Sequence, residues 1–264
     1  MALDLAFESV GDGPPLLILH GLFGSAGNWR SVARALSREH RVLSVDLRNH
    51  GASPWSDSMS YLDMADDVLR LIERQGLSRP GVIGHSMGGK VAMALALMQP
   101  HRVGHLSVVD IAPIPYADRL SAVGEAMRAI DTLGAASREE VRQRLAGRLP
   151  DQGLAAFLMQ SLVARNAHFD WRFNLAAILP AIPALSGFPA ELSGLRFARP
   201  LHVIAGGRSD YVTRTDGAEY QPMFARARVD VIGSAGHWVH AERPEAFVAA
   251  LQRALQCTAV PVPT

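Results

Sequence analysis

The sequence predicts an α/β protein with a mainly parallel, twisted sheet that is flanked by helices and carries a helical cap inserted between strands. Short apolar runs alternate singly with segments of helical spacing, and this alternation implies right-handed crossovers between parallel strands. The alternation stops at residue 112 and resumes near residue 200. We therefore expect residues 1–112 and 200–264 to form the core and residues 113–199 to form the cap.

Six short runs predict strands of the sheet. They cover residues 16–19, 41–45, 80–83, 105–110, 201–205 and 229–232. The alternating pattern of residues 3–7 indicates a further, half-exposed strand, and residues 11–13 are typical of a hairpin-like turn. Helices are expected between the strands, for example one that begins at a capping box of Ser60 and Asp63 and ends at Gly76.

The inserted segment predicts several helices and no strand. Helical spacing or a helix N-cap pattern is present over residues 120–130, 137–145 and 152–162. Three prolines are expected to interrupt the chain on its return, namely Pro180, Pro183 and Pro189. Because ligands bind at the carboxyl ends of parallel strands, an insertion on that side predicts a cap over a site.

The composition is that of an ordinary soluble globular enzyme, with 48% hydrophobic and 19% charged residues and a net charge of +1. Acids and bases are scattered, which argues against nucleic acid or an anionic membrane as the main partner. With one cysteine, Cys257, no intrachain disulfide can form. The chain has no signal-peptide pattern and no apolar stretch of membrane-spanning length, so we expect a cytoplasmic monomer or small homo-oligomer.

The stretch from Gly84 to Gly88 is a complete G-x-S-x-G motif, preceded by an apolar run and followed by helical spacing until Pro100. A strand-to-helix turn this tight needs glycine on both sides. It strains the backbone of Ser86 and lifts the hydroxyl above the sheet edge. We predict that Ser86 is a nucleophile and that the backbone N–H of Met87, at the helix start, binds an oxyanion.

A serine hydroxyl needs a base, and His237 is the strongest candidate among ten histidines. It follows the last strand in a glycine-flanked loop and comes after Ser86 in chain order. His85 points the wrong way if Ser86 faces outward, and His20 is expected to brace a loop by hydrogen bonds. His240 forms an H-x-x-H pair with His237, which is a weak metal signal without a carboxylate or cysteine partner, and we expect no metal.

The loop after the first buried strand is expected to supply the second oxyanion donor. The backbone N–H of Leu22, which follows a His-Gly pair, is the first choice, and that of Phe23 is the alternative. The side chains of Phe23, His85 and Trp238 are expected to line the substrate pocket.

Two aspartates fit the role of the acid that orients the base histidine. Asp210 follows the penultimate strand, the commonest position for this acid, and Asp110 follows the strand after the serine motif, from which it can also reach the histidine. Both give the chain order Ser, Asp, His, so spacing does not separate them. Asp46 also lies at a strand end, but we interpret it as structural, tied to Arg48 and to a turn at Gly51.

Together these motifs resemble those of the α/β-hydrolase superfamily, and within it the YbfF-type esterases, over nearly the whole chain. The resemblance is carried by residues 20–25, 46–53, 84–90, 110–113, 171–174 and 236–242. In that family the acid follows the strand after the serine motif, so the resemblance favours Asp110 over Asp210. It also implies hydrolysis of carboxylic esters, with acyl thioesters as a second class, and no cofactor.

The sequence thus predicts a serine esterase that acts on a small-molecule ester or thioester through an acyl-enzyme. His237 would deprotonate Ser86 while Asp110 orients the imidazole. The N–H groups of Leu22 and Met87 would hold the oxyanion. Carbon–carbon bond hydrolysis or cofactor-free perhydrolysis on the same triad is an alternative, and a ligand receptor of this fold without turnover is an alternative outside enzymes.

Overall fold

The structure is a computed structural model that describes residues 1–118, 120–130, 132–149, 152–165, 168–215 and 217–258. Within these residues, seven strands form one sheet in the order β1-β3-β2-β4-β5-β8-β9. The strands are β1 Phe7–Val10, β2 Pro15–Leu19, β3 Arg41–Val45, β4 Gly81–His85, β5 His105–Val109, β8 Leu201–Gly206 and β9 Ala227–Ile232. All neighbouring strands are parallel except the β1–β3 pair, so the predicted mainly parallel sheet is confirmed.

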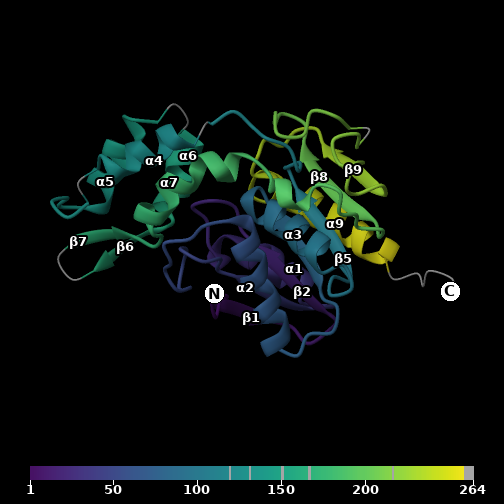
Figure 1. Ribbon diagram of the computed structural model, residues 1–264. Helices are drawn as coiled ribbons and strands as arrows, with labels where there is room; N and C mark the ends of the chain where they lie inside the picture. The colour runs from purple at the N-terminus through teal and green to yellow at the C-terminus, as the bar shows by residue number, and fades with distance from the viewer. Residues whose placement is uncertain (119, 131, 150–151, 166–167, 216, 259–264) are drawn as a thin grey trace.

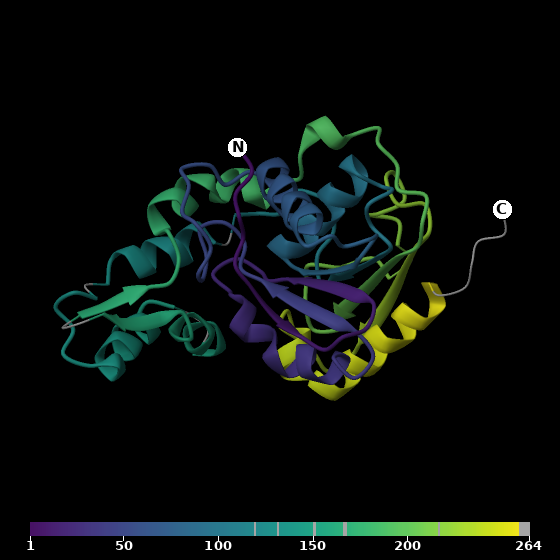
Figure 2. The same cartoon turned by 90° about the horizontal axis from the view of Figure 1, so that it is seen from below.

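Helices cover both faces of this sheet. The core helices are α1 Arg30–Leu36, which follows the 3-10 turn Ala26–Trp29, α2 Tyr61–Arg74, α3 Met87–Met98, α8 Val239–Glu242 and α9 Pro244–Thr258. Successive side chains of a strand point to opposite faces. Accordingly, Leu16 and Ile18 pack in one apolar cluster with residues of α1 and α9, whereas Leu17 and Leu19 pack in a larger one with residues of α2 and α3. Figure 2 shows the sheet between these two pairs of helices.

The chain between β1 and β2 does not form the expected hairpin. β1 pairs antiparallel with β3, and β2 pairs with the other edge of β3, so β3 lies between them. The turn carries the chain past the end of α1, where a Cβ on Gly11 would lie 2.2 Å from the backbone oxygen of His40. The strand also begins at Phe7 rather than at residue 3, because the backbone N–H of Leu3 donates to Asp67 at 2.6 Å instead of to a strand.

The cap elements lie together at one side of the core in both views (Figures 1 and 2). They are α4 Ser121–Arg128, α5 Arg138–Ala146, α6 Gln152–Met159, β6 Leu162–Arg165, β7 His168–Trp171 and α7 Leu175–Ser186. The expectation of a cap without strands is wrong, since β6 and β7 pair antiparallel. Each of these strands has four residues and only one buried position, Leu162 in β6 and Trp171 opposite it in β7. One buried residue makes no alternating apolar pattern, so the sequence did not indicate these strands.

The prolines of the returning segment also behave differently from the expectation. Pro180 and Pro183 lie inside the helix α7, and only Pro189 follows its end. Each internal proline removes one helical hydrogen bond. The helix persists because its buried residues Ile178 and Ile182 pack in the cap and hold it by tertiary contacts.

Candidate active site

Ser86 lies at a strained turn between β4 and α3. Its backbone has φ 52° and ψ −119°, a combination that residues other than glycine seldom adopt. A Cβ on Gly84 would lie 2.2 Å from the oxygen of Gly88, and a Cβ on Gly88 would lie 2.4 Å from that of Leu19. Glycine is therefore required at both flanks. Met87 is the first residue of α3, and the first N–H groups of a helix have no acceptor within it.

The ring of His237 contacts the carboxylate of Asp110. His237 Nδ1 lies 2.7 Å from Asp110 Oδ2. Asp110 follows β5 with φ 51° and is fully buried. Its other oxygen accepts the N–H of Gly206 at 2.9 Å, and Oδ2 also accepts the hydroxyl of Ser209. The carboxylate thus has partners in the loops after β8 and β9, which fixes its position beneath the ring.

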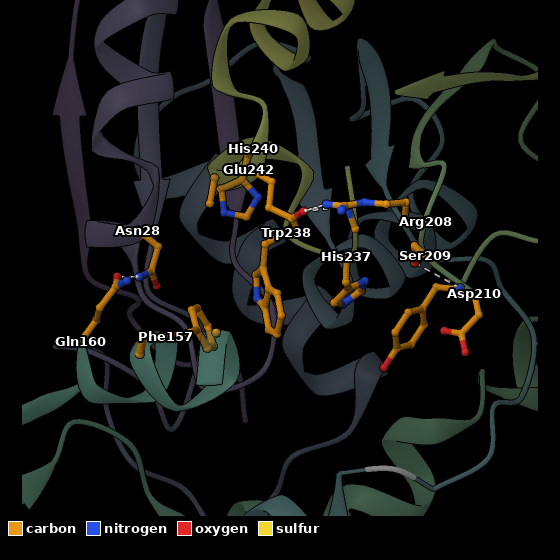
Figure 3. Close-up of a pocket in the computed structure, with 15 residues that line it drawn as sticks. Asn28, Phe157, Gln160, Arg208, Ser209, Asp210, His237, Trp238, His240 and Glu242 are labelled. Atoms are coloured by element: carbon orange, nitrogen blue, oxygen red, sulfur yellow. Dashed lines mark hydrogen bonds and ion pairs between the residues drawn. The ribbon is translucent and has the colours of Figure 1, made fainter. Parts of the chain in front are cut away.

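The two aspartates that spacing left equivalent occupy different positions. Asp210 lies on the wall of an open cavity, and Figure 3 shows that its carboxylate is not turned toward the ring of His237. The sequence signal is equal because both aspartates follow a strand. The structure brings only Asp110 of the pair into hydrogen-bond distance of His237 Nδ1 among the residues that it describes.

Ser86 and His237 line the same cavity, which has a volume of about 190 Å³. The predicted pocket residues Phe23, His85 and Trp238 lie on its wall. The cap supplies apolar residues that sequence patterns did not single out for this role, namely Leu120, Val123, Leu154 and Phe157. The polar groups of the cavity, among them Ser86 and His237, therefore lie on its core side, whereas its cap side is apolar.

Two further cavities adjoin the site. A wide, open cavity of about 730 Å³ lies beside His237, and its wall carries both aromatic and polar side chains (Figure 3). There Asn28 Nδ2 donates to Gln160 Oε1 at 2.6 Å, which joins core to cap, and Arg208 pairs with Glu242 at 2.9 Å. A cavity of only about 40 Å³ lies on the other side of Ser86.

Comparison with known proteins places this geometry in a family. The sequence profile described as the Alpha/beta hydrolase family matches residues 16–250. Esterase YbfF of Escherichia coli (strain K12) is 36% identical over 242 residues, which cover 91% of this chain and 92% of that protein. The chain belongs to the α/β-hydrolase family.

Other relatives agree with this assignment. The sn-1-specific diacylglycerol lipase ABHD11 of Mus musculus is 35% identical over 90% of this chain and 80% of that protein. A solved structure named Marine microorganism esterase superposes with a TM-score of 0.90 at 34% identity, covering 97% of this chain and 99% of that one. The predicted resemblance to YbfF-type esterases and the α/β-hydrolase fold are confirmed, and the chain is an α/β hydrolase of the esterase and lipase type.

Tyr211 is a site residue of this α/β hydrolase that sequence reasoning missed. Its ring stacks on that of His237 with centroids 4.1 Å apart and planes at 24°. The hydroxyl of Tyr116 donates to the backbone oxygen of Tyr211 at 2.7 Å and helps to hold it. A lone tyrosine beside Asp210 carries no motif, so only the three-dimensional structure reveals the contact.

Three other histidines near the site have lowered pKa values because they are buried. Burial lowers the pKa of His20 to about 4, that of His240 to about 3 and that of His85 well below its usual range. His20 Nε2 accepts the N–H of Leu47 at 3.0 Å, and its Nδ1 lies 2.8 Å from the backbone oxygen of Gly21, in the loop that this ring is expected to brace. His240 stacks on Trp29 with ring centroids 4.0 Å apart. These rings are neutral structural parts of the site.

The glycine-rich loop after β2 is also held by a histidine. The N–H of Phe23 donates to His50 Nε2 at 3.2 Å, so it is not available to bind an oxyanion. The N–H of Leu22 is therefore the better candidate donor. Phe23 itself has φ 62°. Its carbonyl accepts the hydroxyl of Ser161 from the cap at 3.0 Å.

Asp46 is structural, but its expected tie to Arg48 is wrong. Asp46 accepts the N–H groups of Ala26 and Ala52 at 2.7 and 2.9 Å. Arg48 instead forms a buried, two-pronged pair with Asp67, at 2.7 and 2.8 Å. The reason is orientation: the guanidinium points under the loop toward α2, whereas the Asp46 carboxylate occupies the space that a Cβ on Gly51 would need.

In the described ranges, no three His, Cys, Asp or Glu side chains converge as metal ligands do. None of the helices among the described residues has the length and apolar character needed to cross a bilayer.

Proposed function

We propose that this α/β hydrolase is a serine esterase that hydrolyses carboxylic esters, and acyl thioesters as a second class, through an acyl-enzyme. The observation that carries the proposal is the 2.7 Å contact between His237 Nδ1 and buried Asp110, with His237 and Ser86 on one cavity wall. Asp110 accepts from Nδ1, which leaves Nε2 as the proton acceptor.

In the proposed reaction, His237 Nε2 takes the Ser86 proton as Oγ attacks the carbonyl carbon. The backbone N–H groups of Leu22 and Met87 bind the oxyanion, and loss of one such donor typically costs about 10²–10³ in rate. The imidazolium then protonates the leaving oxygen or sulfur, and the acyl group stays on Ser86. Water that is deprotonated by His237 attacks the acyl-enzyme and releases the acid.

The cavities support a division of the substrate. The leaving group must lie within reach of His237, which returns the proton to it, and the wide, open cavity lies beside that residue. We place the acyl group in the cavity of about 190 Å³, whose cap side is apolar. We also propose that residues 113–199 act as the cap, because α4 and α6 supply that apolar wall.

Labelling with a fluorophosphonate followed by peptide mapping tests the nucleophile. We expect covalent label on the peptide that contains Ser86, and no label in Ser86→Ala. A label on another residue, or no label on the wild-type protein, would contradict the proposal.

A substrate panel tests the reaction class. Aryl esters and acyl thioesters of increasing chain length should turn over, whereas vinylogous diketones, which report carbon–carbon bond hydrolysis, should not. Tight retention of an ester with a single slow turnover would instead favour the receptor alternative.

A further inference from the structure

Lys90 is the only lysine in the sequence, and its side chain is buried, with 1% of its surface exposed. It lies in the first turn of α3, four residues after Ser86. Its Nζ lies 3.0 Å from the backbone oxygen of Ile114, 3.0 Å from that of Ser186 and 2.6 Å from that of Gly187. An ammonium has three N–H donors, so all of them are engaged.

The three acceptors belong to the two junctions between cap and core. Ile114 lies where the chain leaves the core after β5, and Ser186 and Gly187 lie where it returns from α7. The junctions also contact each other, because the N–H of Tyr116 donates to the oxygen of Ser186 at 2.9 Å. One side chain of α3 therefore binds both ends of the segment between residues 114 and 187, which holds the cap helices α4 to α7.

Two tyrosine rings complete the surroundings of the ammonium. Nζ lies 4.8 Å from the ring centroid of Tyr116 and 5.8 Å from that of Tyr61, distances at which ring faces attract a cation. The hydroxyl of Tyr61 donates to the oxygen of Leu185 at 2.7 Å. Burial raises the pKa of both tyrosines, so they stay neutral. Burial also lowers the pKa of Lys90 to about 7, whereas the three carbonyl acceptors favour its protonated form.

This arrangement forms a wall of the site. The cavity of about 40 Å³ beside Ser86 is lined by Lys90, Tyr61 and Tyr116 together with Leu22 and Met87. Because its donors are already engaged, Lys90 has none left for a substrate. Lys90 therefore contributes to the site through the aliphatic part of its side chain and through the two cap junctions that it binds.

We propose that Lys90 is a positioning residue that fastens both cap junctions to the helix that begins at Ser86, and so sets the shape of the cavity beside the nucleophile. The fastening stands on the contacts alone, whereas its effect on catalysis rests on the proposed esterase function.

The test compares wild-type protein with Lys90→Met, which keeps the length of the stem but removes all three donors. The matched control is Arg128→Met, which removes a cation from the exposed surface of the cap. Hydrogen exchange should become at least about tenfold faster over residues 113–118 and 183–189 in Lys90→Met only, because charge-assisted hydrogen bonds are lost. Exchange in β2 and β4 should stay unchanged and reports intact folding of the core.

Kinetics separate a positioning role from a direct one. For an aryl ester with a six-carbon acyl chain, KM should rise about tenfold in Lys90→Met while kcat stays within about threefold. The rate of labelling by a small fluorophosphonate should also stay within about threefold, because Ser86 and His237 are held by the core.

Three results would overturn the proposal. The first is unchanged exchange at both junctions, and the second is an equal change in Arg128→Met. The third is a loss of labelling as large as the loss of turnover, which would place Lys90 in direct contact with the chemistry. If Lys90→Met does not fold, Lys90→Gln retains two donors and must show the same effects in smaller size. Hydrogen exchange can be measured without any enzymatic activity. It therefore tests the binding of the junctions by Lys90 even if wild-type Ser86 is not labelled and the proposed esterase function fails.

Discussion

The two halves of the candidate site are held in different ways. On the core side, backbone hydrogen bonds hold two residues of the proposed triad: the N–H of Ser86 donates to the oxygen of Val109 at 3.0 Å, and that of Asp110 donates to the oxygen of Ile204 at 3.0 Å. On the cap side the wall consists of apolar side chains such as Leu154 and Phe157, carried by a short helix. The comparison suggests that the sheet places the proposed chemistry, whereas the cap determines what can approach it.

The link between the halves is itself specific. The loop after β3 meets the cap where the N–H of Gly51 donates to Arg172 at 2.7 Å and that of Asn174 donates to Asn49 at 2.9 Å. These contacts join two segments, residues 48–51 and residues 171–174, that are more than 100 residues apart in the sequence. Each motif supplies a backbone surface for the other.

The largest effect is expected at the acid of the core side. Asp110→Asn should lower kcat about 10⁴-fold, because an amide favours the wrong tautomer of His237. The matched control is Asp210→Asn, which should stay within about threefold of wild type. Steady-state kinetics on an aryl ester provide the measurement. If Asp210→Asn abolishes turnover while Asp110→Asn leaves it intact, the core side is organised differently from our proposal.

The next effect concerns the buried ion pair beneath the loop that meets the cap. Asp67→Ala should lower the free energy of unfolding by about 3–5 kcal/mol, because it leaves Arg48 buried without its main partner. Its neighbour on α2, Asp66, is exposed, and Asp66→Ala should change stability by less than about 0.5 kcal/mol. Denaturant unfolding measures the free energy of unfolding of both variants. Equal losses would show that the buried Arg48–Asp67 pair contributes no more to stability than an exposed aspartate does.

Acid should weaken the core through its buried histidines. Burial lowers the pKa of His20 to about 4 and of His50 and His240 to about 3, whereas histidines of the unfolded chain titrate near 6.5. Between pH 6.5 and 4 the unfolded chain therefore binds more protons than the folded protein. The free energy of unfolding should fall as pH falls, by up to about 1.4 kcal/mol per pH unit for each group.

A substitution isolates one of these groups. His240→Phe should keep the stacking on Trp29 and reduce the slope of stability against pH by about one proton. The control His101→Phe makes the same change at an exposed histidine. Denaturant unfolding at pH 7, 6 and 5 gives the slopes. An unchanged slope in His240→Phe would mean that this ring binds its proton equally well in the folded protein and in the unfolded chain.

The smallest effect is expected on the cap side. Leu154→Ala should lower kcat/KM for a medium-chain ester about threefold to tenfold, mostly through KM, because it removes apolar contact with the acyl group. Leu133→Ala changes an exposed leucine of the cap and should have no effect. A fall in kcat at constant KM would show that the cap takes part in the chemistry rather than in binding.

The sequence by itself determined the order of the core elements. Each strand and helix of the core carries its own signal, as with the helix N-cap at Ser60 and the glycines around Ser86. Local sterics, for example the lack of space for a Cβ at Gly84, require glycines at the tight strand-to-helix turn around Ser86. The motif therefore indicates this turn wherever it lies between a strand and a helix. This is why the positions of Ser86, Asp110 and His237 at strand ends could be predicted.

Tertiary structure decided between alternatives that local sequence signals do not separate. Asp110 and Asp210 both follow a strand, and only the packing of the loops after β8 and β9 brings Asp110 under His237. The same holds for the prolines of α7, a helix that packs against α4 of the cap. The β6–β7 hairpin pairs residues close in sequence, but each of its strands has only one buried position and so carries no apolar pattern. Pairing and packing between distant segments contribute more free energy than local propensity, and that contribution cannot be read from one segment at a time.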